Sequence, residues 1–360
     1  MDLVRFALIG CGRMGITADD VASHWITSDL WMPLSHASAI RASPECDLVA
    51  VCDSDPARLH AARERYKVEF GFENVEEMLD KIRPDAVCIA TRTRERAPII
   101  RTCIAAGVKG IFCEKPLSLT LEDADEIHSL VQNAGIPFLL GTRRRFMPVY
   151  ERARNEFWSG RVGEPQTVLL EFGAAPLLWT HPHTVDLAFF MANDSPMHNL
   201  EAKLDYPSGS WSGNKLDCDP YVRHAILEFR NHITAHILRS GGLDVVLSGS
   251  EGKITIASDG LFTHMRLKNE RPGKLDAGMF GRRLDIPTPR EISGTVATIT
   301  LLAKAVKGDK SGLPDANCFL NNMEVLFGLV ESDLRSGERV DCPLPRRGLQ
   351  ITGRIGNLYP

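Results

Sequence analysis

Residues 1–140 alternate short apolar runs with longer amphipathic segments. The apolar runs are rich in Val, Ile, Phe and Cys, which is typical of buried parallel strands, and several of the segments between them end at a glycine. The predicted strands are 4–9, 48–52, 86–90, 110–113 and 137–140. The predicted helices are 56–67, 96–106 and 121–133. This alternation indicates βαβ units around a parallel sheet, that is, a doubly wound Rossmann domain of the α/β class.

After residue 141 the pattern changes to runs in which apolar and polar residues alternate. Such runs predict an antiparallel sheet with one face packed on helices. The predicted strands are 167–172, 223–230, 233–238, 245–247 and 253–257, the helices 149–158, 296–306 and 316–335, and the loops 204–220 and 269–291. Because 360 residues exceed one ordinary core, we expect two domains. These are a Rossmann domain, 1–141, and an α+β domain with a large, mostly antiparallel open sheet, 142–360, whose last helix or tail could pack back on the first.

A glycine-rich turn follows the first predicted strand directly, reading GCGRMG from Gly10 to Gly15. Gly10 can form the tight turn, Gly12 can let a pyrophosphate approach, and Gly15 can let helix and strand pack closely. Arg13 and Met14 would line the same loop, at a helix start whose N–H groups attract phosphate. We therefore predict a dinucleotide site here, with a simple glycine turn as the alternative.

The same fingerprint needs an acidic residue after the second strand to bind the adenosine ribose, usually about 20 residues further on. Asp53 fits this role, but it lies 38 positions after Gly15. The spacing is explained if residues 16–33 are an insertion and the helix resumes around His36. A carboxylate at the ribose favours NAD, whereas Arg58 close by leaves NADP as the less favoured option.

The composition is that of an ordinary globular protein, with 44% hydrophobic and 24% charged residues and a formal net charge of -4. This charge gives no reason to expect binding to nucleic acid or to an anionic membrane. The sequence has no run of about 18 apolar residues and no signal-peptide pattern at its N-terminus. Nine scattered cysteines without a Cys-x-x-Cys pair favour reduced thiols and a cytoplasmic protein.

A second motif follows the strand at 110–113 and reads Glu114-Lys115-Pro116-Leu117. With it, the chain resembles the glucose-fructose oxidoreductase, inositol dehydrogenase and rhizopine-catabolism (Gfo/Idh/MocA) family. Further segments match in the same order along nearly the whole chain, at 90–91, 144–148, 183–186, 249–252 and 332–340.

The resemblance implies that Thr91, Glu114 and Lys115 lie beside the cofactor. It also implies that Lys115 is a catalytic residue that reaches the reacting hydroxyl of the substrate, and that the peptide before Pro116 is cis. An ammonium group in a desolvated pocket could orient an alcohol and stabilise a developing alkoxide. A surface lysine at a strand end is the alternative.

The family carries its acid/base pair as an aspartate, a histidine four residues later, and a second aspartate three residues after that. His183 and Asp186 match this pattern, but Trp179 replaces the first aspartate. The resemblance implies that His183 is the catalytic base, with a helix cap near Thr184 as the alternative. Either Asp186 or His181 would supply the second polar contact to the substrate, or the substrate presents a different group at this position. No metal is expected, because no third ligand accompanies the two histidines at a suitable spacing.

Arginines gather in two segments, 92–96 and 143–145, the first of which departs from the residues usual in the family. Two interpretations stay open. The arginines are solvated helix ends, or Arg92 or Arg144 pairs with a carboxylate or phosphate of the substrate. The second interpretation makes Arg144 a substrate-binding residue and favours an acidic sugar, a sugar phosphate or a nucleotide sugar.

The sequence therefore predicts an NAD-dependent oxidoreductase that transfers hydride between nicotinamide and a secondary alcohol or ketone. The predicted substrate is a sugar, sugar acid, cyclitol or nucleotide sugar. The alternatives are an NAD-retaining lyase or glycosidase of the same family and a non-catalytic NAD-binding regulatory protein. By analogy with the family, a homodimer or homotetramer is expected.

Overall fold

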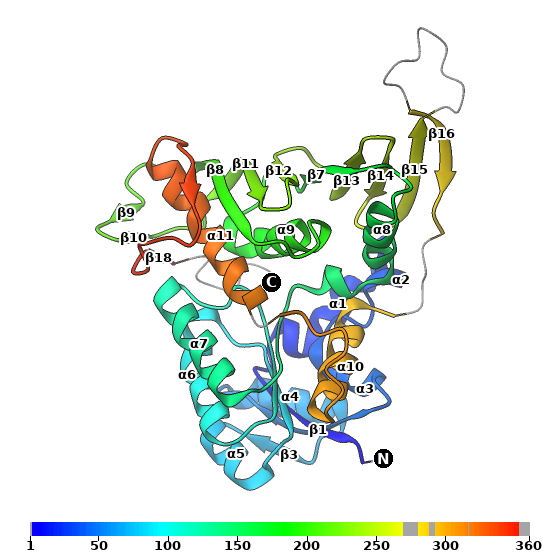
Figure 1. Cartoon of the computed structure of the whole chain (residues 1–360). Helices are drawn as coiled ribbons and strands as arrows, with labels where there is room; N and C mark the ends of the chain where they lie inside the picture. The colour runs from blue at the N-terminus through cyan, green and yellow to red at the C-terminus, as the bar shows by residue number, and fades with distance from the viewer. Residues whose placement is uncertain (1, 269–279, 288–291, 316, 353–360) are drawn as a thin grey trace, which may run out of the picture. The chain divides into compact units, whose positions relative to one another are not determined.

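The computed structural model describes residues 2–268, 280–287, 292–315 and 317–352 (Figure 1). Contacts divide the chain into two units, Met1–Phe146 with Ile292–Met323 and Met147–Glu291 with Glu324–Pro360. A late segment of the sequence therefore belongs to the N-terminal unit.

The first unit contains a six-stranded parallel sheet, which confirms the predicted Rossmann fold. Its strands are β1 (Val4–Ile9), β2 (Cys46–Cys52), β3 (Phe70–Phe72), β4 (Ala86–Ile89), β5 (Gly110–Cys113) and β6 (Phe138–Leu140). They lie in the order β3-β2-β1-β4-β5-β6. The direction of the strand order reverses between β1 and β4, and in open α/β sheets ligands bind at the carboxyl ends of strands flanking that point. Strand β3 was not predicted, because this strand has three residues and only Phe72 is buried.

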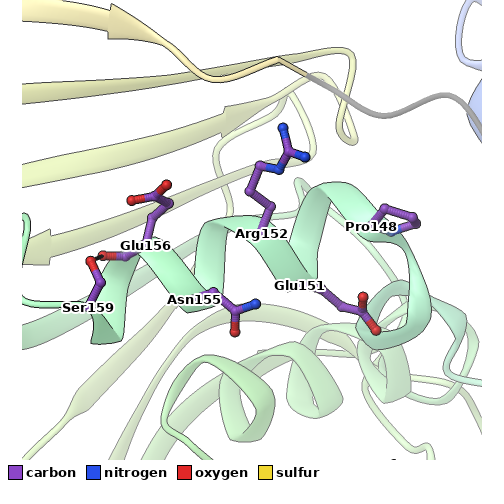
Figure 2. A pocket seen from close by; sticks show the side chains of 6 residues that line it. All are labelled: Pro148, Glu151, Arg152, Asn155, Glu156 and Ser159. Carbon is purple, nitrogen blue, oxygen red and sulfur yellow. Dashed lines mark hydrogen bonds between the residues drawn. The ribbon is translucent and has the colours of Figure 1, made fainter.

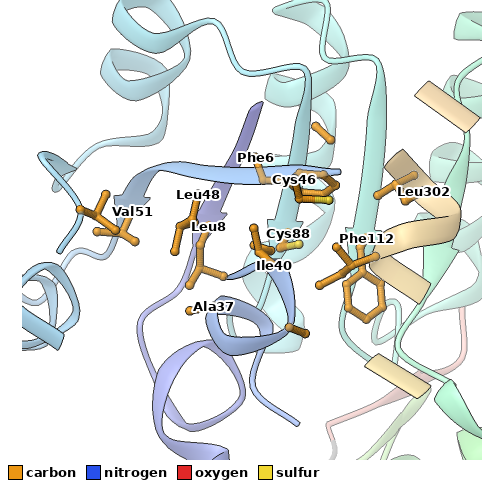
Figure 3. Packing of buried hydrophobic residues seen from close by; sticks show 14 of the residues in the cluster. Phe6, Leu8, Ala37, Ile40, Cys46, Leu48, Val51, Cys88, Phe112 and Leu302 are labelled. Carbon is orange, nitrogen blue, oxygen red and sulfur yellow. The ribbon is translucent and has the colours of Figure 1, made fainter. Parts of the chain in front are cut away.

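Helices connect and cover these strands. They are α3 (His36–Ala42), α4 (Pro56–Tyr66), α5 (Val75–Ile82), α6 (Thr93–Ala105), α7 (Leu121–Ala134) and α10 (Gly294–Val306). Asp55 and Thr120 cap α4 and α7 with their side-chain oxygens, as expected at helix N-termini. Figure 3 shows the core that results, in which Leu8 of β1 and Phe112 of β5 pack with Ile40 of α3 and Leu302 of α10.

The predicted insertion after Gly15 is present as short helical pieces before α3. These are a five-residue π-helical turn, η1 (Arg13–Thr17), followed by α1 (Ala18–Ala22) and α2 (Ser28–Trp31). The buried Asp19 carboxylate accepts hydrogen bonds from Leu34 N at 2.6 Å and from the Ser35 backbone and hydroxyl, which closes the base of the insertion. Helix α3 then begins at His36, as the sequence predicted.

The second unit contains a nine-stranded sheet that is antiparallel except for one pair, which confirms the predicted class. The order is β16-β15-β14-β13-β7-β12-β11-β8-β17, and β7 pairs in parallel only with β12. The strands are β7 (Pro165–Glu171), β8 (Met197–Asp205), β11 (Tyr221–Phe229), β12 (Thr234–Leu238), β13 (Asp244–Gly249), β14 (Gly252–Ala257), β15 (Phe262–Lys268), β16 (Phe280–Asp285) and β17 (Val340–Asp341). Helices α8 (Pro148–Trp158) and α9 (Leu177–Met191) pack on this sheet. Helix α11 (Asn317–Leu334) runs from the first unit into the second.

Two predicted loops contain strands. Residues 204–220 include β9 (Trp211–Ser212) and β10 (Lys215–Leu216), which form a small sheet with β18 (Gln350–Ile351). Strand β16 lies inside the predicted loop 269–291, of which residues 269–279 and 288–291 fall outside the described residues. Two-residue strands show no periodicity, and the charged, glycine-containing sequence of β16 resembles a loop, which explains both errors.

Candidate functional site

The glycine loop leaves β1 at the switch point of the parallel sheet. Gly10 has a φ of 97°, and a Cβ atom there would lie 2.8 Å from the Ala90 carbonyl carbon. A Cβ atom at Gly15 would overlap the Gly10 carbonyl oxygen, whereas one at Gly12 would meet nothing within 4 Å. The first and third glycines therefore allow close packing of the backbone, and the second faces open space. This arrangement fits the pyrophosphate of a dinucleotide.

Asp53 follows β2 directly, beside the glycine loop. Its carboxylate accepts hydrogen bonds from Cys11 N at 2.7 Å and Asp55 N at 2.9 Å, and it pairs with Arg58 Nη2 at 2.9 Å. Burial opposes ionisation of Asp53, but the Arg58 contact and these two N–H groups outweigh it, so the pKa lies below its ordinary value. An ionised acceptor therefore stands where the fingerprint places the adenosine ribose.

Glu114, at the end of β5, is the centre of a buried polar cluster. Its carboxylate pairs with Arg143 and with His36 Nε2, the latter at 3.0 Å, and it accepts a hydrogen bond from Lys115 N at 3.2 Å. The His36 ring is fully buried and stacks on Phe112, with 4.6 Å between ring centroids. Burial opposes ionisation of Glu114, but Arg143 and then His36 outweigh it and lower the pKa. The segment that carries Lys115 is thus anchored from two sides, an arrangement that no sequence pattern indicated.

Lys115 is half-buried beside this cluster, and its pKa is lowered to about 8. Desolvation is the main cause; Glu114 opposes the shift, and the positive charges of Arg143, Arg96 and Arg13 add to it. The lysine therefore remains mostly protonated at neutral pH but loses its charge just above it. The Lys115-Pro116 peptide is cis, which confirms the expectation from the family.

Four of the arginines near the ends of β4 and β6 are buried, so the interpretation as solvated helix ends is wrong for these four, whereas Arg92 and Arg94, exposed at the start of α6, fit it. Exposed fractions are 5% for Arg96 and 4%, 8% and 4% for Arg143, Arg144 and Arg145. Arg96 donates hydrogen bonds to the carbonyl oxygens of Thr91, at 2.8 Å, and Pro116. It therefore ties the end of β4 to the Lys115 segment. Arg92 is exposed.

Arg144, predicted to bind substrate, lies in the short 3-10 helix η2 (Arg143–Phe146) after β6. Its guanidinium carbon is 4.8 Å from the centroid of the Trp31 ring, which is a cation–π contact between η2 and the insertion. Trp31 is 5% exposed, so its ring is part of the packed base of the insertion.

In the second unit, α9 carries the other predicted site residues. Because 179, 183 and 186 are spaced four and three apart, Trp179, His183 and Asp186 lie along one side of the helix. His183 is well inside α9, which begins at Leu177, so the alternative that it caps a helix near Thr184 is wrong.

His181 is about 200° around the helix from His183, since successive residues turn by about 100°. It is fully buried, and neither ring nitrogen has a well-formed hydrogen bond to the described residues. Desolvation lowers its pKa to about 4, although the nearby Ala175 backbone opposes the shift. The structure therefore separates His181 from the side of α9 that carries His183 and Asp186.

A carboxylate that the sequence analysis did not single out stands at the start of α9. Asp219 accepts hydrogen bonds from Leu178 N at 2.7 Å and Trp179 N at 3.1 Å. It caps the helix from a different segment of the chain, which is why the local sequence gave no signal for it. An acidic group thus lies beside the main chain of Trp179, the residue that replaces the first aspartate of the family pattern.

A shallow hollow also lies along α8 in the second unit (Figure 2). It is lined by Pro148, Glu151, Arg152, Asn155, Glu156 and Ser159, none of which is a predicted site residue. Within the described residues, no group of three His, Cys, Asp or Glu side chains could hold a metal ion. In the same part of the chain, no helix has the length and apolar character needed to cross a membrane.

Comparison with known proteins agrees with this geometry. Residues 4–142 match the model of a family described as "Oxidoreductase family, NAD-binding Rossmann fold". The chain is 32% identical over 167 residues to an inositol 2-dehydrogenase from Rhizobium meliloti, covering 46% of this chain and 44% of that protein. It is 27% identical over 196 residues to a D-apiose dehydrogenase from Paraburkholderia graminis, covering 54% and 47%. The matches thus span about half the length of these curated relatives.

Solved structures share the fold over nearly the whole chain. A levoglucosan dehydrogenase in complex with NADH and levoglucosan superposes with a TM-score of 0.74 at 17% identity, covering 95% of this chain and 100% of that one. The WlbA dehydrogenase from Bordetella pertussis, in complex with NADH and UDP-GlcNAcA, gives a TM-score of 0.69 at 18% identity, covering 95% and 99%. This chain therefore shares its fold with both solved structures. Its first unit is an NAD-binding Rossmann fold.

Proposed function

Since the chain belongs to the Gfo/Idh/MocA oxidoreductase family, through the NAD-binding Rossmann fold of residues 4–142, we propose that it is an NAD-dependent dehydrogenase. Its reaction is the reversible oxidation of a secondary alcohol on a sugar, sugar acid, cyclitol or nucleotide sugar. When bound, NAD supplies the hydride acceptor. The observation that carries the proposal is the half-buried Lys115 at the end of β5, with its pKa lowered to about 8 and its segment anchored by Glu114.

The cofactor residues in this proposal come from four neighbouring strand ends of one parallel sheet. The glycine loop, with Arg13 and Met14, receives the pyrophosphate, and Asp53 receives the adenosine ribose. Thr91, Glu114 and Lys115 lie at the ends of β4 and β5, on the other side of the switch point, where the nicotinamide half would lie. This division follows from the strand order and from the open space at Gly12.

Lys115 and His183 handle the proton of the substrate hydroxyl. Protonated Lys115 donates a hydrogen bond to the hydroxyl oxygen and stabilises the negative charge that develops on it. His183 accepts the hydroxyl proton, because an imidazole titrates near neutral pH. Asp186, one turn further along the same side of α9, provides a second polar contact.

Two observations support the proposed substrate class: the names of the relatives and the position of Arg144. The relatives named above act on inositol and apiose, and two solved relatives hold levoglucosan or UDP-GlcNAcA. Arg144, held against Trp31, is a cation within the first unit that suits a carboxylate or phosphate. Of the two histidines considered for the substrate, His181 is the weaker candidate, because its ring is fully buried on another side of α9.

A panel of cyclitols, sugars, sugar acids, sugar phosphates and nucleotide sugars tests the proposal. NADH formation from NAD is expected with at least one member, and its loss in both Lys115→Ala and His183→Ala. Turnover without net NADH would favour an NAD-retaining lyase or glycosidase. If both variants retain the biological activity in full, the proposal that the protein is an enzyme is contradicted, and a regulatory protein is favoured.

The assembly in this proposal is a homodimer or homotetramer formed through the half-exposed face of the nine-stranded sheet. A row of neighbouring residues on that face runs across five strands: Ile226, His236, Leu169, Val246 and Thr255. Three of the five are branched aliphatic side chains, and none of the five is fully buried within the chain. Pairing two such faces would remove this apolar surface from water.

The compartment in this proposal is the cytoplasm. All nine cysteines are free, and six of them are buried. Burial raises the pKa of thiols such as Cys52 and Cys103 to about 12, which keeps them protonated and unreactive. Such cysteines behave as small apolar core residues.

A further inference from the structure

The Asp53 carboxylate has no acceptor position left for a ribose hydroxyl. An ionised carboxylate offers about four lone-pair positions. The main-chain N–H groups of Cys11 and Asp55 take one on each oxygen, at 2.7 and 2.9 Å. The guanidinium of Arg58 takes the others, with Nε at 3.2 and 3.3 Å from the two oxygens and Nη2 at 2.9 Å from Oδ1.

Arg58 is the only one of these three partners that can leave. The two N–H groups belong to the backbone of the glycine loop and the α4 cap, whereas 49% of the Arg58 side chain is exposed. Its guanidinium also pairs with Asp55, through Nη1 and Oδ2 at 3.2 Å. An Arg58 side chain released from Asp53 thus keeps an anchor at the same end of α4.

We propose that Arg58 sets the choice between NAD and NADP, because it competes with the ribose hydroxyls of NAD for Asp53 and binds the 2′-phosphate of NADP. The inference rests on the proposed position of the ribose at Asp53. In the NAD complex the ribose hydroxyls displace Arg58 from the carboxylate. In the NADP complex the guanidinium turns its two-pronged face to the phosphate and offsets the charge of Asp53. The protein therefore binds both cofactors, NAD more tightly.

Dissociation constants for NAD⁺ and NADP⁺ at one fixed ionic strength test the inference in the full-length protein. Arg58→Ala should weaken NADP⁺ binding by about tenfold or more, while NAD⁺ binding stays within about threefold or tightens. Arg58→Lys keeps the charge without the two-pronged geometry of the guanidinium. Its dissociation constant for NADP⁺ should lie between those of wild type and Arg58→Ala. Arg65→Ala removes the same side chain two turns along α4, where it pairs with the exposed Asp20, and should change neither constant by more than about twofold.

Asp53→Asn separates failure of this inference from failure of the proposed cofactor site. It should weaken NAD⁺ binding and strengthen NADP⁺ binding, because it removes an ionised acceptor and a repulsive charge. If Asp53→Asn changes neither constant, the ribose does not lie at Asp53 and the proposed cofactor site is wrong. If Asp53→Asn acts as expected but Arg58→Ala weakens both cofactors equally, or leaves NADP⁺ unchanged, only the role of Arg58 is overturned. Melting temperatures of all variants, with Arg58→Lys as the conservative change, exclude loss of folding as the cause.

Discussion

Lys115 is a residue whose charge is set by its surroundings. Desolvation and the neighbouring positive charges of Arg143, Arg96 and Arg13 favour its neutral form, while Glu114 favours the ammonium. The balance gives a pKa of about 8, so a rise in pH from about 7 to about 9 removes the charge. In the proposed reaction only the ammonium can stabilise a developing alkoxide.

We therefore predict that kcat/KM for alcohol oxidation falls as the pH rises through about 8. In Lys115→Arg this alkaline fall should disappear up to about pH 10, because a guanidinium stays charged, although the absolute rate should drop. Lys115→Met should lower kcat by about a hundredfold or more over the whole range. If kcat/KM of Lys115→Arg falls at alkaline pH as it does in wild type, a group other than Lys115 is responsible for the fall.

His181 contributes to stability through its neutral form. Its pKa is about 4 in the folded chain, below its ordinary value of 6.5, so between these values only the unfolded chain takes up the proton. The contribution of neutral His181 to the unfolding free energy is complete above pH 6.5 and is lost as the pH falls toward 4. Between about pH 7 and pH 5, wild type should lose about 2 kcal/mol more unfolding free energy than His181→Leu.

Urea unfolding of the two proteins at the two pH values measures this difference. The pKa of buried His36 is also lowered by desolvation, and its effect has the same sign. Because His36 is present in both proteins, its effect cancels in the comparison. Equal losses in wild type and His181→Leu would refute the assignment.

At the scale of the element, the buried parallel strands were predictable because each is a short, continuous apolar run followed by a helix. Helix α9 was not, because it is buried on nearly all sides and contains Pro182, so it has no amphipathic pattern. The positions of Gly10, Asp53 and Lys115 at strand ends followed from motifs. The partners His36, Arg96, Arg143 and Asp219 did not, because each reaches its contact from a segment distant in sequence.

The insertion before α3 depends on one buried carboxylate. We predict that Asp19→Ala lowers the unfolding free energy by about 2 kcal/mol, because the Leu34 and Ser35 N–H groups lose a buried acceptor. The neighbouring Asp20 provides the matched control, since its side chain is exposed and pairs with Arg65 at the surface. Asp20→Ala should lower the unfolding free energy by less than about 1 kcal/mol. Urea unfolding measures both variants. Equal costs would show that Asp19 does not hold the insertion.

At the scale of the whole molecule, the face of the nine-stranded sheet that carries Leu169 and Val246 is the proposed interface. We predict that Val246→Arg converts the assembly to monomers, because it places a charge within this row, beside Leu169. Lys81→Glu, on the exposed surface of α5 in the first unit and outside this sheet, is the control and should assemble as wild type does. Analytical ultracentrifugation distinguishes these states, and an unchanged assembly in Val246→Arg would exclude this face.

The central claim is that hydride passes from a carbinol carbon of the substrate to NAD with the help of Lys115 and His183. The most direct measurement follows a single turnover with the best substrate of the panel, deuterated at that carbon. We predict deuterated NADH, formed more slowly than the unlabelled form, and NADH formation that is slower by about a hundredfold or more in Lys115→Met. Product that forms without NADH, or NADH that carries no deuterium, would contradict it.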